Sequence, residues 1–564
     1  MKLSRLLGVL AIASLPRVAA AGGLFLPGSG AVSTSRAGAG VASADDGEAI
    51  ALNPAGIAKA KGTTITLSAA MLSYAMQFQR RGTYDNSGEG LPYDGQRYPL
   101  EKNDAKPPLG FASVQPVPVI AVISDLGGVV PGLHVGLGLY APNAYPFRDI
   151  CTQTANGCLK YRFNQEATEP PTTRYDIMKQ EAAILLPSLD LAYRVLPQLD
   201  VGVRLSAGFA NLKSTTAVWG SANANYAENV KQDGTFAIDA SDRFVPAFGV
   251  GVKRSRSGRF VPAFGVGVTY RPTPNLELAA NYSSELDIHS KGGAVAQLGS
   301  EASMPLPGVP ATVGPVLDQF ARCATGGTSA NDLKACVDLA LPMSVTIGGR
   351  YKFLDHAGGL RADIELDLDW ENWGKTCTDQ QLEDGSCINA SDYRVVVDGQ
   401  ANVGAGAFPL QTSIVRHNLK DGYGAHLGGS YHIPLGAEGA SDEVVVRGGI
   451  GYDTRVARDG WLRADLDGAA RTTLALGAGY RARRFEVNVG GGVVLEGSPS
   501  NPNIGGGAQP CNPSDNGGCN GIKDGGPNPV QPILTLNNQQ TSPINQGDFK
   551  SHYVMFMLGA STWF

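Results

Sequence analysis

The stretch Leu360-Arg-Ala-Asp-Ile-Glu-Leu-Asp-Leu-Asp-Trp370 alternates apolar and charged residues throughout its length. Successive side chains of an extended strand point to opposite faces, so one face of this segment is apolar and the other is charged. In a soluble β-sandwich the apolar face would cover a core. In a membrane barrel it would face lipid, while the charged face would line the lumen. A single strand cannot decide between these folds, but the spacing of similar segments can.

Similar segments along the chain predict fourteen strands. We expect them at residues 63–80, 109–125, 132–142, 177–195, 198–219, 259–271, 275–290, 341–354, 358–375, 419–434, 442–456, 470–481, 484–497 and 548–564. The connections between them are alternately long and short. Long outer loops and short periplasmic turns are typical of bacterial outer-membrane barrels, whereas a sandwich has no reason to keep that alternation. The predicted fold class is all-β, a 14-stranded antiparallel transmembrane β-barrel in the bacterial outer membrane.

The composition argues against several other classes of protein. The 564 residues carry a net charge of −5 and no long basic run, so nucleic-acid binding has no electrostatic support. There is no GxSxG elbow, HExxH motif or P-loop, and the seven histidines are scattered. We therefore expect no catalytic residue, no metal and no cofactor. A lipase with a Ser–His pair remains the enzymatic alternative.

The first residues have the three parts of an export signal. Lys2 and Arg5 supply a short positive region, residues 6–15 form an apolar core, and Ala19-Ala20-Ala21 supplies the small residues that a signal peptidase needs. The core is too short to span a bilayer as a helix. We expect residues 1–21 to be a signal peptide, and the alternative is a buried N-terminal helix.

The chain ends in another alternating strand. One face of this strand carries Val554, Phe556, Leu558, Ala560, Thr562 and Phe564. A terminal strand that closes on an aromatic residue resembles the signal by which outer-membrane proteins are passed to their assembly machinery. We expect that machinery to recognise Phe564, and we expect the barrel to be a monomer in contact with outer-membrane lipid.

Eight cysteines fall into four close pairs within the long loops. No CxxC motif is present, which argues against zinc-ribbon and thioredoxin-like sites. An exported protein meets an oxidising compartment, so local disulfides are expected, with unpaired structural cysteines as the alternative. The predicted disulfides are Cys151–Cys158, Cys323–Cys336, Cys377–Cys387 and Cys511–Cys519.

A ten-residue sequence is present twice, at Arg243–Val252 and again at Arg259–Val268. If both copies were barrel strands, the barrel would have fifteen, whereas single-chain bacterial barrels usually have an even number. We expect the first copy to lie in the third long loop or to extend a strand outside the membrane. We assign no function to the duplication.

The segment before the first strand has a recognisable pattern. It reads Gly22-Gly-Leu-Phe-Leu-Pro27, Ser35-Arg-Ala-Gly-Ala-Gly40, Ala44-Asp-Asp46 and Leu52-Asn-Pro-Ala-Gly56. This pattern resembles the hatch of the FadL-type long-chain fatty acid transporters, and the Asn-Pro-Ala tripeptide is the hallmark of that family. Matches continue at Gly138-Leu-Tyr-Ala-Pro142, Trp370-Glu-Asn-Trp373 and Arg447-Gly-Gly-Ile-Gly-Tyr-Asp453. The departures from the family pattern lie in the loops, especially 291–340 and 498–547.

The resemblance implies a fourteen-stranded barrel, residues 63–564, plugged by an N-terminal hatch segment, residues 22–62. It also implies passive uptake of long-chain fatty acids or similar hydrophobic molecules, which displace the hatch and leave sideways into the bilayer beside a kinked third strand. A fatty acid gains roughly 0.8 kcal/mol per buried methylene, so a lateral exit into lipid suits it better than an aqueous pore.

The resemblance also assigns roles to residues. Asn53, Pro54 and Ala55 should anchor the hatch segment, with a plain Asn-Pro turn as the alternative. By position, Leu24, Phe25 and Leu26 should contact the ligand. Gly136 and Gly138 should let the third strand bend.

One long outer loop contains an unusually apolar stretch. Its apolar residues are Leu306, Val309, Val313, Val316, Leu317 and Phe320. An exposed apolar stretch can be a docking site for hydrophobic ligands, and the alternative is that the loops pack on one another.

Two questions about the cargo stay open in the sequence. Some relatives of the FadL type carry neutral aromatic hydrocarbons, and the acidic stripe of residues 360–370 would also suit a polar-solute porin. We favour a stripe that is balanced inside the lumen by Arg204, Arg361 and Arg447. An acidic lumen repels a carboxylate unless arginines offset it.

Overall fold

The structure of the protein is a computed structural model. The residues that it describes are 24–84, 90–107, 113–155, 157–161, 169–219, 231, 233–244, 263–302, 309–324, 326–375, 392–410, 413–415, 417, 419–436, 442–458, 463–498 and 547–564. Among these residues, no helix has both the length and the apolar character needed to cross a bilayer.

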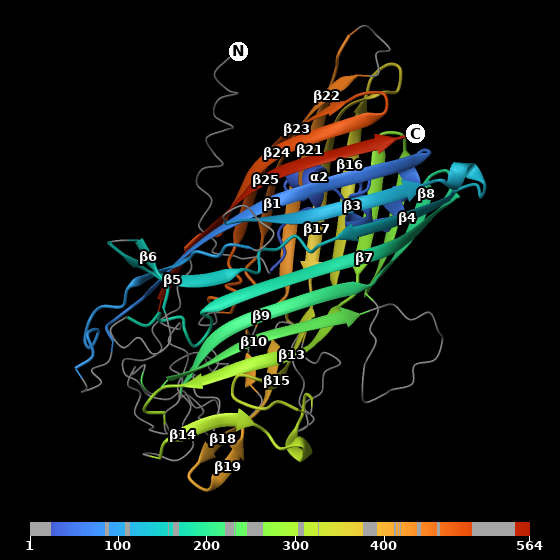
Figure 1. The fold of residues 1–564 in the computed structure, drawn as a ribbon. Helices are drawn as coiled ribbons and strands as arrows, with labels where there is room; N and C mark the ends of the chain where they lie inside the picture. Colours follow the sequence, from blue (N-terminus) through green and yellow to red (C-terminus); the bar gives the residue numbers. More distant parts are fainter. Residues whose placement is uncertain are drawn as a thin grey trace, which may run out of the picture.

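Fourteen antiparallel strands form a closed barrel within the described residues, because the last strand, β25 (Gly547–Trp563), pairs with the first, β1 (Thr63–Arg80) (Figure 1). The other barrel strands, in order round the wall, are β3 (Val114–Ser124), β4 (Leu133–Tyr140), β7 (Lys179–Leu196), β8 (Leu199–Ser206), β11 (Ala263–Thr273), β12 (Leu276–Ser283), β16 (Ser344–Leu354), β17 (Leu360–Glu371), β21 (Gly422–Pro434), β22 (Glu443–Asp453), β23 (Arg471–Arg481) and β24 (Phe485–Leu495). The predicted fold class is confirmed.

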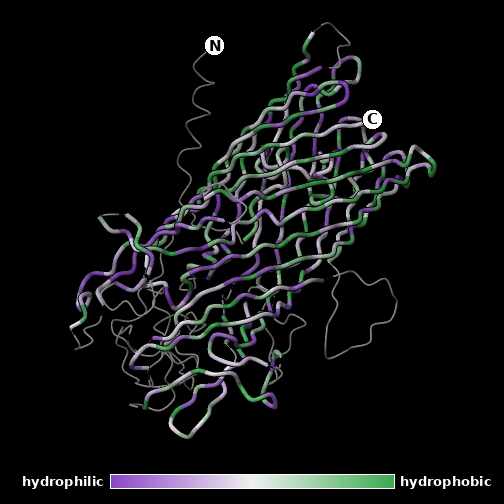
Figure 2. The backbone as a smooth tube through the Cα atoms, in the orientation of Figure 1, coloured by the Kyte–Doolittle hydropathy of each residue, from purple (hydrophilic) through white to green (hydrophobic). Residues whose placement is uncertain are grey.

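The alternation that predicts the strands also sets the two faces of the wall. On β17, Ile364 and Leu368 are 46% and 45% exposed and point outward, whereas Glu365 and Asp367 between them are buried. Figure 2 shows hydropathy changing from residue to residue along many of the strands. An apolar outer face with charges turned inward is the arrangement expected of strands surrounded by lipid.

On one side of the barrel the wall continues outward as a second antiparallel sheet, here called the outer sheet. It begins on the outer half of β7 and continues through β9 (Gly208–Trp219), β10 (Asp233–Phe244), β13 (Leu286–Leu298), β15 (Leu333–Leu341) and β18 (Tyr393–Val403). The predicted strands 198–219 and 275–290 are therefore each two strands, separated at Ala207 and at residues 284–285. The remaining short strands are β2 (Leu100–Asn103), β5 (Arg148–Thr154), β6 (Gly157–Leu159), β14 (Ala311–Pro315), β19 (Gly406–Pro409) and β20 (Ser413–Val415).

The duplicated sequence adds no fifteenth strand among the described residues. The first copy contributes the last two residues of β10, and Phe244 pairs with Gly208. The second copy contributes the start of β11, and Ala263 pairs with Ser206. The two partners, Gly208 at the start of β9 and Ser206 at the end of β8, are two positions apart in the chain. β10 and β11 therefore pair one after the other along the continuous segment formed by β9 and β8. Residues 245–262 lie outside the described residues.

The hatch segment, described from residue 24, is buried inside the barrel (Figure 1). Its helical elements are α2 (Gly30–Ser35), α3 (Ala49–Leu52) and the 3₁₀ turn η2 (Pro54–Lys59). Helix α2 packs against β22 to β25 and β1, whereas η2 packs against β7, β8 and β11. The predicted signal peptide, residues 1–21, lies outside the described residues.

Two of the predicted disulfides are present. Cys151–Cys158 joins β5 to β6, and Cys323–Cys336 ties a loop to β15. Both lie outside the fourteen barrel strands, as predicted. The pairs Cys377–Cys387 and Cys511–Cys519 lie outside the described residues.

Candidate functional site

A buried charge cluster holds the hatch segment to one side of the barrel. The Arg36 guanidinium lies 2.8 Å from Asp363 and 2.8 Å from Glu365 on β17, and all three side chains are almost fully buried. Arg350 on β16 adds a second cation, 2.6 Å from Asp363. The opposite charges and direct hydrogen bonds compensate for the loss of water around each group. We call this cluster, together with Asp367, the charged dock.

The charged dock also binds hatch backbone. One Glu365 oxygen accepts the amides of Ala42 and Ser43 at 2.7 and 3.1 Å. An Asp367 oxygen accepts the amides of Gly40 and Val41 at 2.7 and 2.9 Å. The acidic stripe therefore supplies hydrogen-bond acceptors to a segment more than 320 positions away in the chain.

The prediction that Arg204, Arg361 and Arg447 balance the acidic stripe was wrong. Arg204 donates instead to the hatch carbonyls of Ile50 and Ala51. Arg361 is exposed and faces Asp355. The partner of Arg447 is Glu486, at 2.6 Å. The stripe is balanced largely by Arg36, a hatch residue that the alternation of the strand could not reveal.

The Asn-Pro-Ala tripeptide lies where α3 ends and η2 begins. The Asn53 amide donates to the Val41 carbonyl at 2.9 Å and to the Thr269 hydroxyl of β11 at 3.3 Å. Its carbonyl oxygen accepts the Ala55 amide at 3.1 Å, which caps η2. Pro54 stands at the first position of η2, where no amide hydrogen is needed. Asn53 thus joins two parts of the hatch segment to the wall, which supports the predicted anchoring role.

The opposite side of the hatch segment meets β3 and β4 mainly through apolar packing, together with a hydrogen bond from the His134 ring of β4 to the Ala60 carbonyl at 3.1 Å. Ile50 and Ile57 pack with Val119 and Ile123 of β3 in one buried cluster. On β4, a Cβ atom added to Gly138 would lie 2.1 Å from the Ile50 methyl carbon, so glycine permits this close approach. We call these contacts the apolar contact.

The strand pairing does not test the predicted bend of the third barrel strand, β4. β4 pairs with β3 and β7 without a register shift, and both Gly136 and Gly138 face the hatch segment. Their proximity to the hatch is a feature that the sequence did not reveal. The kink itself stays a prediction.

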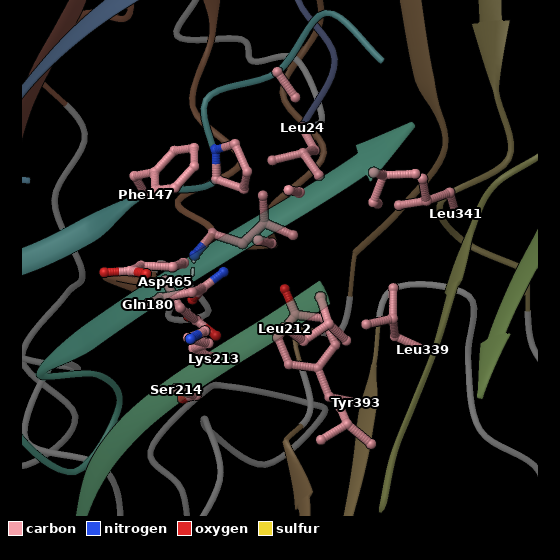
Figure 3. A pocket seen from close by; sticks show the side chains of 18 of the residues that line it. Leu24, Phe147, Gln180, Leu212, Lys213, Ser214, Leu339, Leu341, Tyr393 and Asp465 are labelled. Carbon is pink, nitrogen blue, oxygen red and sulfur yellow. Dashed lines mark hydrogen bonds between the residues drawn. The ribbon is translucent and has the colours of Figure 1, made fainter. Parts of the chain in front are cut away.

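Outside the hatch segment lies an elongated cavity of about 420 Å³, here called the outer cavity. Its walls come from the outer sheet, from β3 and β7, and from the start of the described chain, and most of the side chains are apolar (Figure 3). Examples are Leu24, Leu212, Phe236, Val337, Leu339 and Leu341. A concave, mainly apolar cavity with a few polar groups is the usual form of a binding site for hydrophobic molecules.

Phe25 separates the outer cavity from a second, deeper one. It lines both cavities, and its ring lies 5.8 Å from that of Trp373. Its carbonyl accepts a hydrogen bond from Arg471 at 2.7 Å. The next residue, Leu26, is buried against the deeper cavity and donates to the Asn143 carbonyl at 2.6 Å. Leu24, Phe25 and Leu26 therefore all line one or both of the cavities, and their contact with ligand stays a prediction.

The deeper cavity, of about 250 Å³ and here called the inner chamber, is acidic. Asp367, Asp369, Glu371 and Asp453 line it. His426 lies 3.2 Å from Asp369 and 3.1 Å from Asp453. The lining also includes Arg204, whose guanidinium is engaged by hatch carbonyls. Carboxylates therefore outnumber cations around this chamber.

A gap in the barrel wall lies beside the outer cavity. β4 ends at Tyr140, which pairs with Val119 and Leu186. Its neighbours continue outward, as Val114–Pro118 on β3 and Glu181–Leu185 on β7. Among the described residues, no strand lies between these two segments, and both segments contribute to the lining of the outer cavity. We call this interruption the wall gap.

The edge of the wall gap on β3 carries two prolines, Pro116 and Pro118. Their side chains fall on the outward face of β3, because Val117 between them points inward, and both prolines contribute to the lining of the outer cavity. The Pro118 carbonyl accepts the Ala141 amide at 3.3 Å, so this side of the backbone faces the wall gap. Proline has no amide hydrogen, so these two positions leave no donor unpaired at the edge.

The outer end of the cavity contains a buried ionic cluster. Asp465 lies 2.9 Å from His417 and 3.1 Å from Arg463, and Arg463 also pairs with Asp176 at 3.0 Å. Burial by itself would raise the pKa of Asp465, but Arg463 and His417 outweigh this effect and hold its pKa below the ordinary value. Asp465 therefore stays ionised but paired.

The apolar loop stretch does not line either cavity in its described part. Val313 lies in β14 and packs against the buried face of the outer sheet, and Val316 is buried. Leu317 and Phe320 are 55% and 51% exposed. Val309 is half-buried and Leu306 lies outside the described residues. Their docking role stays a prediction.

Comparison with known proteins gives one family and several solved structures of the same fold. A family profile described as outer membrane protein transport protein (OMPP1/FadL/TodX) matches residues 12–493. A search of curated proteins gives no match. A solved FadL homologue of Pseudomonas aeruginosa is similar, with a TM-score of 0.61 at 12% identity, covering 96% of this chain and 100% of its own.

Two further solved structures share the fold. The toluene transporter TbuX of Ralstonia pickettii has a TM-score of 0.54 at 13% identity, with 96% of this chain and 99% of its own covered. The toluene transporter TodX of Pseudomonas putida has a TM-score of 0.51 at 13% identity, with 96% and 100% covered. At such identities the likeness establishes the barrel fold, and the cargo has to be argued from the cavities.

Proposed function

The chain belongs to the FadL/TodX family of outer-membrane transport proteins and is therefore a transporter of hydrophobic molecules rather than an enzyme; from this premise we propose that it takes up long-chain fatty acids or similar amphipathic molecules passively. Cargo enters the outer cavity, displaces Phe25 and the start of the hatch segment, and leaves through the wall gap into the bilayer. The observation that carries this proposal is the outer cavity, which is mainly apolar and is lined by both edges of the wall gap, on β3 and on β7.

The energetics of lateral exit agree with the shape of the outer cavity. Each methylene that moves from water to an apolar environment gains roughly 0.8 kcal/mol, so a long chain is held in the cavity and then passes to lipid without returning to water. The movement is downhill and needs no coupled energy source.

The inner chamber gives a second reason for a lateral path. A carboxylate that moved inward past Phe25 would enter a chamber in which carboxylates outnumber basic groups and in which Asp369 and Asp453 already share His426. Like charges in a poorly solvated space repel strongly. A fatty acid that leaves through the wall gap avoids this chamber.

A neutral aromatic hydrocarbon is the second candidate cargo. The excess of carboxylates in the inner chamber favours it, because an uncharged ring carries no charge for these groups to repel. Two solved structures with the same fold are toluene transporters, which shows that such a barrel can serve this cargo.

The test is uptake of radiolabelled oleate and toluene by cells with and without the gene. Faster oleate uptake in the strain with the gene supports the first candidate, and faster toluene uptake alone supports the second. Equal uptake of both compounds in the two strains would contradict the transport proposal. Swelling of liposomes in sugar solutions, compared with a general porin, tests the porin alternative.

A further inference from the structure

One row across β7 and β9 brings two uncharged polar side chains to the outer cavity. Gln180 on β7 lies directly opposite Ser214 on β9, and burial along the two strands puts both side chains on the inner face. Cross-strand neighbours of this kind have Cβ atoms about 4.5–5.5 Å apart. Figure 3 shows the two residues near each other at one end of the cavity, away from Leu24.

The rows that follow toward the membrane are apolar. Ala182 pairs with Leu212, and Ile184 pairs with Ala210. These rows are level with the wall gap, whose β7 edge is Glu181–Leu185. From Gln180 to Ile184 the strand rises by about 13 Å. The inner face of the outer sheet therefore changes from polar at its outer end to apolar beside the wall gap.

The polar row is available to a ligand. Among the described residues, no hydrogen bond joins the side chain of Gln180 or Ser214 to another group, although both line the cavity. Cavities of this kind orient their ligands through a small number of well-placed polar groups. An amide and a hydroxyl side by side can each donate and accept a hydrogen bond.

The charges behind the row favour an oxygen-bearing head group. Arg148, the cross-strand neighbour of Gln180 on its other side, is buried and forms no ion pair with a described residue. Its guanidinium donates to the carbonyls of Tyr145, Phe147 and Ala464. Three carboxylates of the described chain contribute to the lining of the cavity, and each has a basic partner: Asp465 pairs with Arg463 and His417, Asp176 with Arg463, and Glu181 with Lys179.

We propose that Gln180 and Ser214 bind the oxygen-bearing head group of the cargo, a carboxyl or hydroxyl group, and that the cargo lies with this head outward and its apolar chain level with the wall gap. The inference rests on the proposed function, since it requires cargo in the outer cavity. It assigns the cargo to amphipathic chains with one polar end, and it separates the head-group site from the acidic inner chamber.

The experiment measures uptake of palmitate, hexadecan-1-ol and hexadecane, which share one chain length and differ in the head group. The double variant Gln180→Leu/Ser214→Val is compared with the wild type and with Thr215→Val. Thr215 is the next residue of β9 and lies on its outward face, so Thr215→Val is the matched control. Heat-modifiable mobility on gels shows that each barrel is folded.

We expect the double variant to take up palmitate and hexadecanol about tenfold more slowly, from the loss of two hydrogen bonds, and hexadecane within about twofold of the wild type. Thr215→Val should leave all three rates unchanged. Equal loss for the three compounds, or no loss for any, would overturn the head-group site while leaving transport intact. If the wild type itself carries none of them, the proposed function fails instead.

Discussion

The charged dock and the apolar contact hold opposite sides of the same hatch segment by different means. Arg36 is bonded to Asp363 and Glu365 at 2.8 Å each, in directions that allow little movement. On the side of β3 and β4, Ile50 and Ile57 rest against apolar side chains, and such packing has no preferred direction. The wall gap lies on the second side, beyond the end of β4. The comparison teaches that the buried ion pairs of the hatch segment lie away from the wall gap, whereas its contacts beside the gap are apolar packing and hydrogen bonds to uncharged groups such as Asn143.

The largest effect is expected from Arg36→Met, which removes a cation from the charged dock. The substitution leaves Asp363 and Glu365 buried with one cation fewer, and removing one member of a buried ion pair costs about 3–5 kcal/mol. We expect rapid hydrogen–deuterium exchange throughout the hatch segment and faster swelling of liposomes in small sugars. The matched control is Arg361→Met on the same strand, because Arg361 is 44% exposed and lies 3.5 Å from Asp355. An unchanged exchange rate in Arg36→Met would contradict the anchoring role.

A smaller effect is expected on the other side, from Gly138→Ala. The added Cβ would lie 2.1 Å from the methyl carbon of Ile50, and overpacking of this kind costs about 1–3 kcal/mol. We expect faster exchange near α3, with thermal unfolding of the barrel unchanged. Ile50→Val removes the clashing carbon and should restore slow exchange in the double variant. Gly349→Ala on β16 is the control, since its nearest atom is 3.5 Å away. Equal effects of Gly138→Ala with and without Ile50→Val would show that the close contact is not the cause.

The smallest effect is expected at Asn53, which lies between the two sides. Asn53→Ala removes the cap of η2 and the hydrogen bond to Val41, and loss of such a cap costs about 1 kcal/mol. We expect hydrogen–deuterium exchange to increase near η2 while Arg36 stays paired with the charged dock. Proteolysis of the intact barrel should then cleave near residue 53 and nowhere else in the hatch segment. Asn211→Ala, at an exposed position of β9, should change nothing. Release of the whole hatch segment would make Asn53, rather than Arg36, the main anchor.

The barrel was predictable because alternation is a local property. The segment 358–375 shows its apolar and charged faces without reference to any partner, and β17 lies within it at Leu360–Glu371. The outer sheet was not predicted, because the same alternation continues across the junction at Ala207 and gives no sign that the strand changes partners. The long connections that carry β10, β13, β15 and β18 were taken for loops or strand ends for a similar reason.

The candidate site was predictable only where position in the chain was enough. Leu24, Phe25 and Leu26 line the cavities, as their position at the start of the hatch pattern led us to expect, and their contact with ligand stays a prediction. The partner of the acidic stripe was missed because Arg36 and Asp363 are 327 positions apart. The wall gap was implied only by resemblance, although Pro116 and Pro118 lie on its β3 edge.

The duplicated sequence is divided between β10 and β11, and this bears on where the chain can accept inserted residues. The repeat is offset by sixteen positions, from Arg243 to Arg259, yet the barrel keeps its strand number and its pairing with β8. The two copies meet different partners, since β10 ends against Gly208 of β9 and β11 begins against Ser206 of β8. We expect an epitope or a purification tag inserted between the two copies to leave the pairing of β11 with β8 unchanged.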